Sequence, residues 1–142
     1  MLRKLLKATL ASSLGFMMVL LAFSAAATID DKKDEKVPTI KEIMTKGHKG
    51  TDAYIAKIKT AAKDGKWDDA KEYAKTLAFF GENLGKNKPP KGDAESWEKL
   101  TKKYADNTKA VSKGVEDQDA KAVGKGLGDI TGSCMECHKA HR

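Results

Sequence analysis

The sequence predicts an all-α fold, in the form of an antiparallel four-helix bundle. Four stretches between residues 38 and 142 place apolar residues at steps of three and four, which is the spacing of one face of an α-helix. Short segments containing glycine, proline or aspartate separate these stretches. No segment of the sequence alternates apolar and polar residues as a strand does. Amphipathic helices joined by short connections typically pack as a bundle.

A secretory signal peptide is predicted over residues 1–27. Arg3, Lys4 and Lys7 precede a mostly apolar run at 14–23, and Ala25-Ala26-Ala27 supplies the small residues of a cleavage site after Ala27. The alternative is an uncleaved membrane anchor, but the apolar run is shorter than the roughly 20 residues that span a bilayer. We therefore expect an exported protein, in the periplasm or another exported compartment.

The remaining residues predict one domain with a short arm before it. Residues 28–37 are too highly charged to be buried, so we expect a flexible N-terminal arm, and 38–142 is long enough for a single domain. All 20 Asp and Glu residues and most of the 27 Lys and Arg residues follow the predicted signal peptide. Because the two signs are interleaved, they indicate a solvated helical surface and no nucleic-acid interface.

The first helix is predicted over 38–63 and the second over 66–85. Pro38 suits the first turn of a helix, where its missing N–H is not needed. Asp64-Gly65 interrupts the apolar pattern between the two helices. Met44 and His48 both fall on the apolar face of the first helix.

A loop and two further helices complete the predicted bundle. Pro89 and Pro90 prevent 85–92 from continuing the second helix. Asp93 is a suitable N-cap for the third helix, which we expect to end near Gly114. The fourth helix begins near 117–119 and runs almost to Arg142.

The interior of this bundle is predicted to have room for a bulky group. Glycine inside a helix costs about 1 kcal/mol relative to alanine, so the glycines of the first and fourth helices either make space for a buried cofactor or mark fraying. They are Gly47, Gly50, Gly124, Gly126, Gly128 and Gly132. The aromatic residues at helical spacing are expected in the core, with packing around a porphyrin as the alternative. They are Trp67, Tyr73, Phe79, Phe80, Trp97 and Tyr104.

The two cysteines lie close together in the pattern Cys-x-x-Cys-His, at Cys134, Cys137 and His138. A disulfide between them would close too short a loop to stabilise the fold appreciably. The pattern is typical of c-type haem attachment, in which two thiols form thioethers with the haem vinyl groups. One helical turn separates the thiols, and the next residue can reach the iron. We predict one covalently attached haem c with His138 as the proximal iron ligand.

Two other chemistries fit the same residues less well. A thioredoxin-like redox pair lies at a helix N-terminus after a strand, whereas this pair falls at the end of an all-helical chain. A zinc site would need Cys134, Cys137, His138 and His141, but adjacent residues diverge by about 100° on a helix and do not readily close a tetrahedron. His141 is expected to face solvent.

Helix order and the C-terminal motif together resemble the class II cytochromes c, the group that contains cytochrome c′. The matching segments are Gly-Asp-Ala-Glu-Ser-Trp at 92–97, Asn107, and 132–142 with the haem motif. The resemblance implies a haem within the bundle, its distal face toward the first helix, and a basic residue such as Arg142 near a haem propionate. It also implies a homo- or heterodimer through the first two helices, with a monomer as the alternative.

The sixth position of the iron has two candidate ligands. The resemblance places the distal residue close to His48, which is the preferred candidate, and Met44 is the alternative one turn earlier. An open position is the third option, in which His48 is a core or surface histidine and Met44 serves ordinary packing. Cytochrome c′ proteins usually have an apolar residue there, so a histidine ligand would depart from their pattern.

The predicted function is one-electron transfer by an exported monohaem c-type cytochrome that is not an enzyme. Such a protein needs redox partner proteins and no catalytic side chains. The alternative from the binding class is a cytochrome c′-like protein that binds nitric oxide or carbon monoxide at an open or displaceable distal site. A non-haem metal or interaction module is the third hypothesis.

Overall fold

A computed structural model describes residues 36–142, which are folded as α-helices. The helices are α1 (Ile40–His48), α2 (Tyr54–Lys63), α3 (Trp67–Leu84), α4 (Ala94–Glu116) and α5 (Ala120–His141), and residues 36–142 contain no strand. The predicted signal peptide and nearly all of the predicted arm lie outside the described residues. Within 36–142, no helix combines the length and apolar character needed to cross a membrane.

The prediction of one continuous helix over 38–63 is wrong, because the chain forms α1 and α2 with a break at 49–53. Thr39 begins α1, where its hydroxyl oxygen accepts a hydrogen bond from the Glu42 N–H at 3.2 Å. Gly50 has a φ of +82°, in the left-handed region that glycine adopts without strain. Ala53 then begins α2 with 1% of its surface exposed. The break therefore buries an apolar residue and needs the glycine.

The other predicted helices are confirmed as α3, α4 and α5. The carboxylate of Asp93 accepts a hydrogen bond from the Ser96 N–H at 2.7 Å and caps α4, as predicted. Asp119 caps α5 in the same way. The predicted end of α4 near Gly114 is two residues early, because Gly114 lies against the backbone of Val123 and the helix continues to Glu116.

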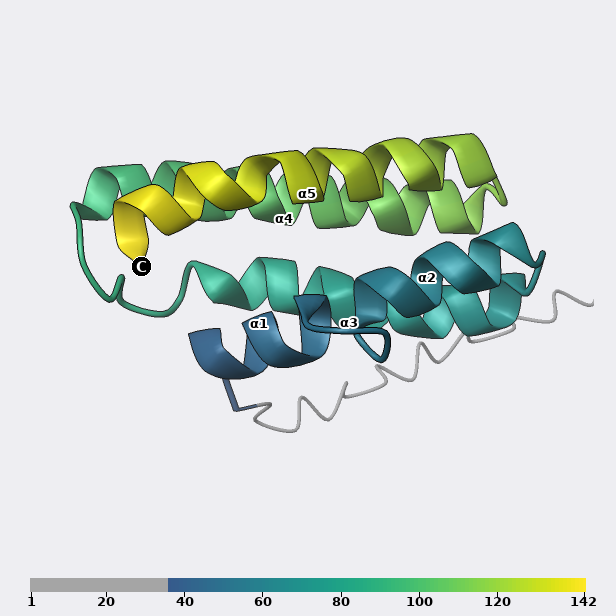
Figure 1. The fold of residues 1–142 in the computed structure, drawn as a ribbon, viewed down its shortest axis with the longest axis horizontal. Helices are drawn as coiled ribbons and strands as arrows, with labels where there is room; N and C mark the ends of the chain where they lie inside the picture. Colours follow the sequence, from purple (N-terminus) through teal and green to yellow (C-terminus); the bar gives the residue numbers. More distant parts are fainter. Residues whose placement is uncertain (1–35) are drawn as a thin grey trace, which may run out of the picture. The chain divides into compact units, whose positions relative to one another are not determined.

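Consecutive long helices run in opposite directions, and the two short helices lie along α3 (Figure 1). Helix α4 packs on both α3 and α5, whereas α2 packs on α3 and α5, and α1 packs on α2 and α3. These contacts enclose one apolar core. Its largest fully buried apolar side chains are Ile43, Ile58, Leu77, Val111, Val115, Val123 and Ile130.

One of the glycines predicted to make room for a cofactor, Gly126, instead allows close helix packing, so that prediction is wrong for it. A Cβ atom on Gly126 would lie 2.8 Å from Cγ2 of Val111, which shows that this glycine lets α5 approach α4 closely. Gly47 faces Phe80 of α3 with more room, because a Cβ atom there would lie 3.5 Å from the Phe80 ring, an ordinary van der Waals contact. A Cβ atom on any of the other three glycines of α5 would have no neighbour within 4 Å; they are Gly124, Gly128 and Gly132.

Candidate functional site

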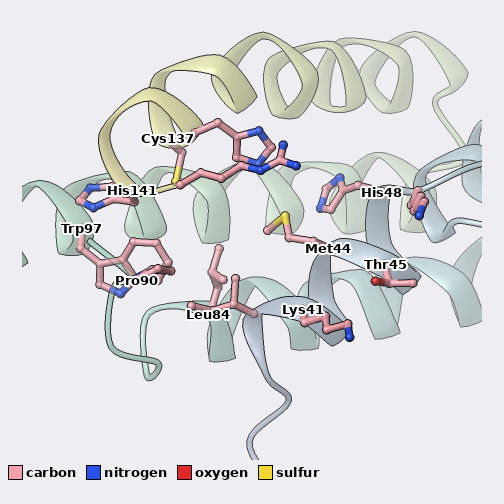
Figure 2. A pocket seen from close by; sticks show the side chains of 13 residues that line it. Lys41, Met44, Thr45, His48, Leu84, Pro90, Trp97, Cys137 and His141 are labelled. Atoms are coloured by element: carbon pink, nitrogen blue, oxygen red, sulfur yellow. The ribbon is translucent and has the colours of Figure 1, made fainter. Parts of the chain in front are cut away.

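A cavity of about 580 Å³ lies between α1 and the C-terminal end of α5. This volume is within the 300–1,000 Å³ typical of sites for small molecules and cofactors. Figure 2 shows Met44 and His48 of α1 across this cavity from Cys137 of α5, with Leu84 at the end of α3 beneath them. A smaller cavity of about 80 Å³ adjoins it, since the two share five lining residues. The shared residues are Met44, His48, Leu84, Cys137 and His138.

One wall of the cavity carries the whole Cys-x-x-Cys-His motif. Both cysteines are half-buried free thiols on the last turns of α5. Cys137 and His138 line both cavities, and Cys134 lines the smaller one. The structure therefore brings the three residues predicted from the motif to a single apolar space. Two thiols and an imidazole on one helix are the donor set that covalent haem attachment requires.

The facing wall carries both candidate sixth ligands. Met44 and His48 lie one turn apart on α1, and each lines both cavities. Nε2 of His48 lies 2.8 Å from the phenol oxygen of Tyr104 on α4, a hydrogen bond in which the tautomer of His48 decides the donor. Among the described residues, the Met44 thioether has no hydrogen-bond partner of this kind. The two candidates therefore differ in whether an existing bond must break before they can bind a metal.

Burial favours the uncharged forms of His48 and Tyr104. Burial lowers the pKa of His48, and the electrostatic effect of the His138 imidazole adds to this lowering. Burial also raises the pKa of Tyr104. A neutral imidazole and a protonated phenol are the states in which this hydrogen bond forms without burying a charge. Tyr104 was expected in the core, and its link to His48 was not predicted.

The prediction that His141 faces solvent is wrong. Only 3% of His141 is exposed. Its Nδ1 lies 2.8 Å from the carbonyl oxygen of Lys91, so this nitrogen carries the proton and donates it. Its Nε2 lies 3.1 Å from the hydroxyl of Ser96, and its ring meets the edge of Trp97 with centroids 5.2 Å apart. Both imidazole nitrogens are therefore occupied in holding the end of α5.

The two rival chemistries find little support in this geometry. Within residues 36–142, no group of three or more His, Cys, Asp or Glu side chains is placed to hold a metal ion. Burial raises the pKa of the Cys134 thiol and of the Cys137 thiol, whereas catalytic redox cysteines have lowered pKa values. The pair also lies at the C-terminal end of its helix. A haem needs only axial side-chain ligands, so the absence of a cluster does not count against it.

The mouth of the larger cavity is positively charged. Lys41, Lys49 and Arg142 are among the residues that line it, and no Asp or Glu side chain in the described part of the chain does. The rest of the lining is largely apolar, with Ile40, Met44 and Leu84 beside Pro90 and Trp97. An apolar space with a cationic mouth fits a flat apolar group that bears carboxylates at one edge, as haem does.

Comparison with known proteins gives no match of any kind: no family model, no curated protein sequence and no solved structure is similar enough to this chain to indicate a relationship.

Proposed function

We propose that this chain is an exported monohaem c-type cytochrome that transfers single electrons and is not an enzyme. The observation that carries the proposal is the position of Cys134, Cys137 and His138 on one wall of a cavity whose facing wall holds Met44 and His48. If the Cys-x-x-Cys-His pattern had arisen by chance on a helix surface, there would be no reason to find a cavity beside it. Export is part of the proposal because the same sequence carries a predicted signal peptide and a predicted site of c-type haem attachment.

In this proposal each residue has a defined part. Cys134 and Cys137 hold the haem through thioethers, and His138 binds the iron from the α5 side. When bound, the haem supplies a one-electron ferric/ferrous couple, and the axial ligands and the burial of the group set its potential. The apolar lining excludes water, and Arg142 with the lysines at the mouth balances the charge of the propionates.

For the sixth position we propose Met44, with His48 as the alternative. Met44 lines the cavity and makes no side-chain hydrogen bond within residues 36–142, whereas Nε2 of His48 is engaged by Tyr104 at 2.8 Å. Binding through Nε2 of His48 would leave the buried Tyr104 hydroxyl without this partner, and an unsatisfied buried polar group costs about 1–3 kcal/mol. Methionine ligation would also raise the reduction potential relative to a second histidine.

The helix arrangement supports the finer description of the fold as a four-helix bundle. In this description α1 and α2 together take the place of the first helix of a class II cytochrome c, and α3, α4 and α5 are the other three. The interruption at 49–53 separates the part that faces the cavity, α1, from the part that packs in the core, α2.

A second candidate function is the binding of nitric oxide or carbon monoxide. The 80 Å³ cavity favours it, because this small space is lined by both candidate distal residues and by the Tyr104 hydroxyl, which can donate a hydrogen bond to a diatomic ligand. In this case the sixth position is open or Met44 is displaced when the gas binds. Partners then include the gas in addition to redox proteins.

Absorption spectra and the intact mass of the exported protein test the proposal. The full chain is produced in a host that attaches haem c, with a Cys134→Ser, Cys137→Ser variant as control. We expect one covalent haem in the parent chain, a low-spin reduced spectrum and no response to carbon monoxide. A high-spin spectrum that shifts with carbon monoxide would establish the gas-binding alternative, and a colourless parent chain without added haem mass would refute both.

A further inference from the structure

The position of α1 relative to α5 is not fixed by direct packing of one helix on the other. Helix α1 packs on α2 and α3, and only Ile43 and Gly47 of its nine residues are buried. The cavity separates it from α5. The distance of Met44 and His48 from His138 therefore depends on connections that run through neighbouring parts of the chain.

Asn87, in the loop between α3 and α4, makes the connection to the start of α1. Its side-chain amide donates a hydrogen bond to the carbonyl oxygen of Pro38 at 3.1 Å. The same amide donates to the carbonyl of Asn83 at 3.1 Å, at the end of α3. Pro38 is buried, and Thr39 next to it caps α1. One amide group thus joins the segment just before α1 to the last turn of α3.

The connection continues from Asn87 to the end of α5. The carbonyl oxygen of Asn87 accepts a hydrogen bond from Nε1 of Trp97 at 2.7 Å. The ring of Trp97 meets that of His141 edge to face, and Lys91 and Ser96 hold the His141 nitrogens. Figure 2 shows Trp97, Pro90 and His141 together at one end of the cavity. His141 lies one turn after His138 on the same helix.

We propose that Asn87 is a positioning residue that sets the separation of the two cavity walls and with it the ligation of the iron. The inference rests on the proposed function. The side-chain amide of Asn87 holds the wall that carries Met44. The carbonyl of Asn87 is connected, through Trp97 and His141, to the wall that carries His138. Loss of the amide leaves α1 held by its buried residues Ile43 and Gly47 and by the bond from His48 to Tyr104, and removes the hydrogen bond at its N-terminal end.

Amide hydrogen exchange and absorption spectra of the haem-loaded chain test this role, with Asn87→Ala as the variant. We expect exchange in α1 to be about fivefold faster, the change expected for one net hydrogen bond, and a high-spin fraction that binds carbon monoxide to appear. Trp97→Phe, which keeps an aromatic ring beside His141 but removes the N–H and part of the indole, should give the same two changes. Ser112→Ala is the matched control, because it removes a hydrogen bond from Ser112 to the Ala74 carbonyl, between α4 and α3 and away from the cavity.

Equal exchange and equal spectra in Asn87→Ala and Ser112→Ala would overturn the positioning role. So would faster exchange throughout the chain with the spectrum unchanged, because that pattern indicates a purely structural contribution. A parent chain that carries no haem would instead refute the proposed function, and the two failures are therefore distinguishable.

Discussion

Nε2 of His48 and the phenol oxygen of Tyr104 lie 2.8 Å apart, and this hydrogen bond joins α1 to α4 beside the candidate haem site. It links a predicted iron ligand to a buried residue of another helix. Whether Nε2 donates or accepts in this bond, it cannot bind a metal while the bond is kept, so the bond separates the roles of His48 and Met44. The roles can be told apart by substituting each residue in turn.

We expect Met44→Ala to convert a low-spin haem to a high-spin form that binds carbon monoxide, because it removes the proposed sixth ligand. His48→Ala should leave the reduced spectrum low-spin and the potential close to that of the parent. Absorption spectra and redox potentiometry measure both effects. The opposite pattern, a high-spin His48→Ala and an unchanged Met44→Ala, would assign the position to His48. Unchanged spectra in both variants would exclude a protein ligand.

A double substitution tests the part of Tyr104. In the Met44→Ala background, Tyr104→Phe removes the hydroxyl and frees Nε2 of His48. His48 lies on the same cavity wall as residue 44. We expect the spectrum to return to low-spin and the potential to fall below that of the parent, because a second histidine replaces methionine. Tyr73→Phe is the control, since Tyr73 does not line either cavity. A double variant that stays high-spin would show that His48 cannot reach the iron.

Two glycines on α5 should respond to alanine with opposite signs. At Gly126 a Cβ atom would lie 2.8 Å from Val111 Cγ2 and 3.3 Å from its backbone nitrogen, so we expect Gly126→Ala to lower the free energy of unfolding by about 1–3 kcal/mol. A Cβ atom on Gly128 would have no neighbouring group within 4 Å. Gly128→Ala should raise the free energy of unfolding by about 0.5–1 kcal/mol, because alanine is the better helix former. Urea unfolding measures both, and two changes of the same sign would contradict the packing of α5 on α4.

Local motifs account for what the sequence predicted correctly. The Cys-x-x-Cys-His motif is contained in five consecutive residues, so its place on one helix face followed from helical geometry alone. Asp93 caps α4 through the backbone of Ser96, again within one turn. The helices α3, α4 and α5 were predicted because their apolar spacing is regular over many turns.

Features that depend on distant parts of the chain were missed. The apolar spacing continues through 49–53, so Gly50 was interpreted as space for a cofactor or as fraying, and a break with a new helix start was not predicted. His141 is buried because the loop at Lys91, 50 positions away, folds back onto the end of α5. No periodicity within α5 encodes that contact. The contribution of Pro90, in the loop before α4, to the larger cavity was missed for the same reason.

His141→Ala should loosen the end of α5 that bears His138. The substitution removes a buried ring and leaves the Lys91 carbonyl and the Ser96 hydroxyl without their partner. We expect the free energy of unfolding to fall by about 2 kcal/mol, in the range for loss of a buried hydrogen-bonding group. Lys139→Ala, on the same turn and less buried than His141, should change it by no more than about 0.5 kcal/mol. Thermal or urea unfolding measures the difference, and equal stability of the two variants would show that the His141 contacts do not hold the helix end.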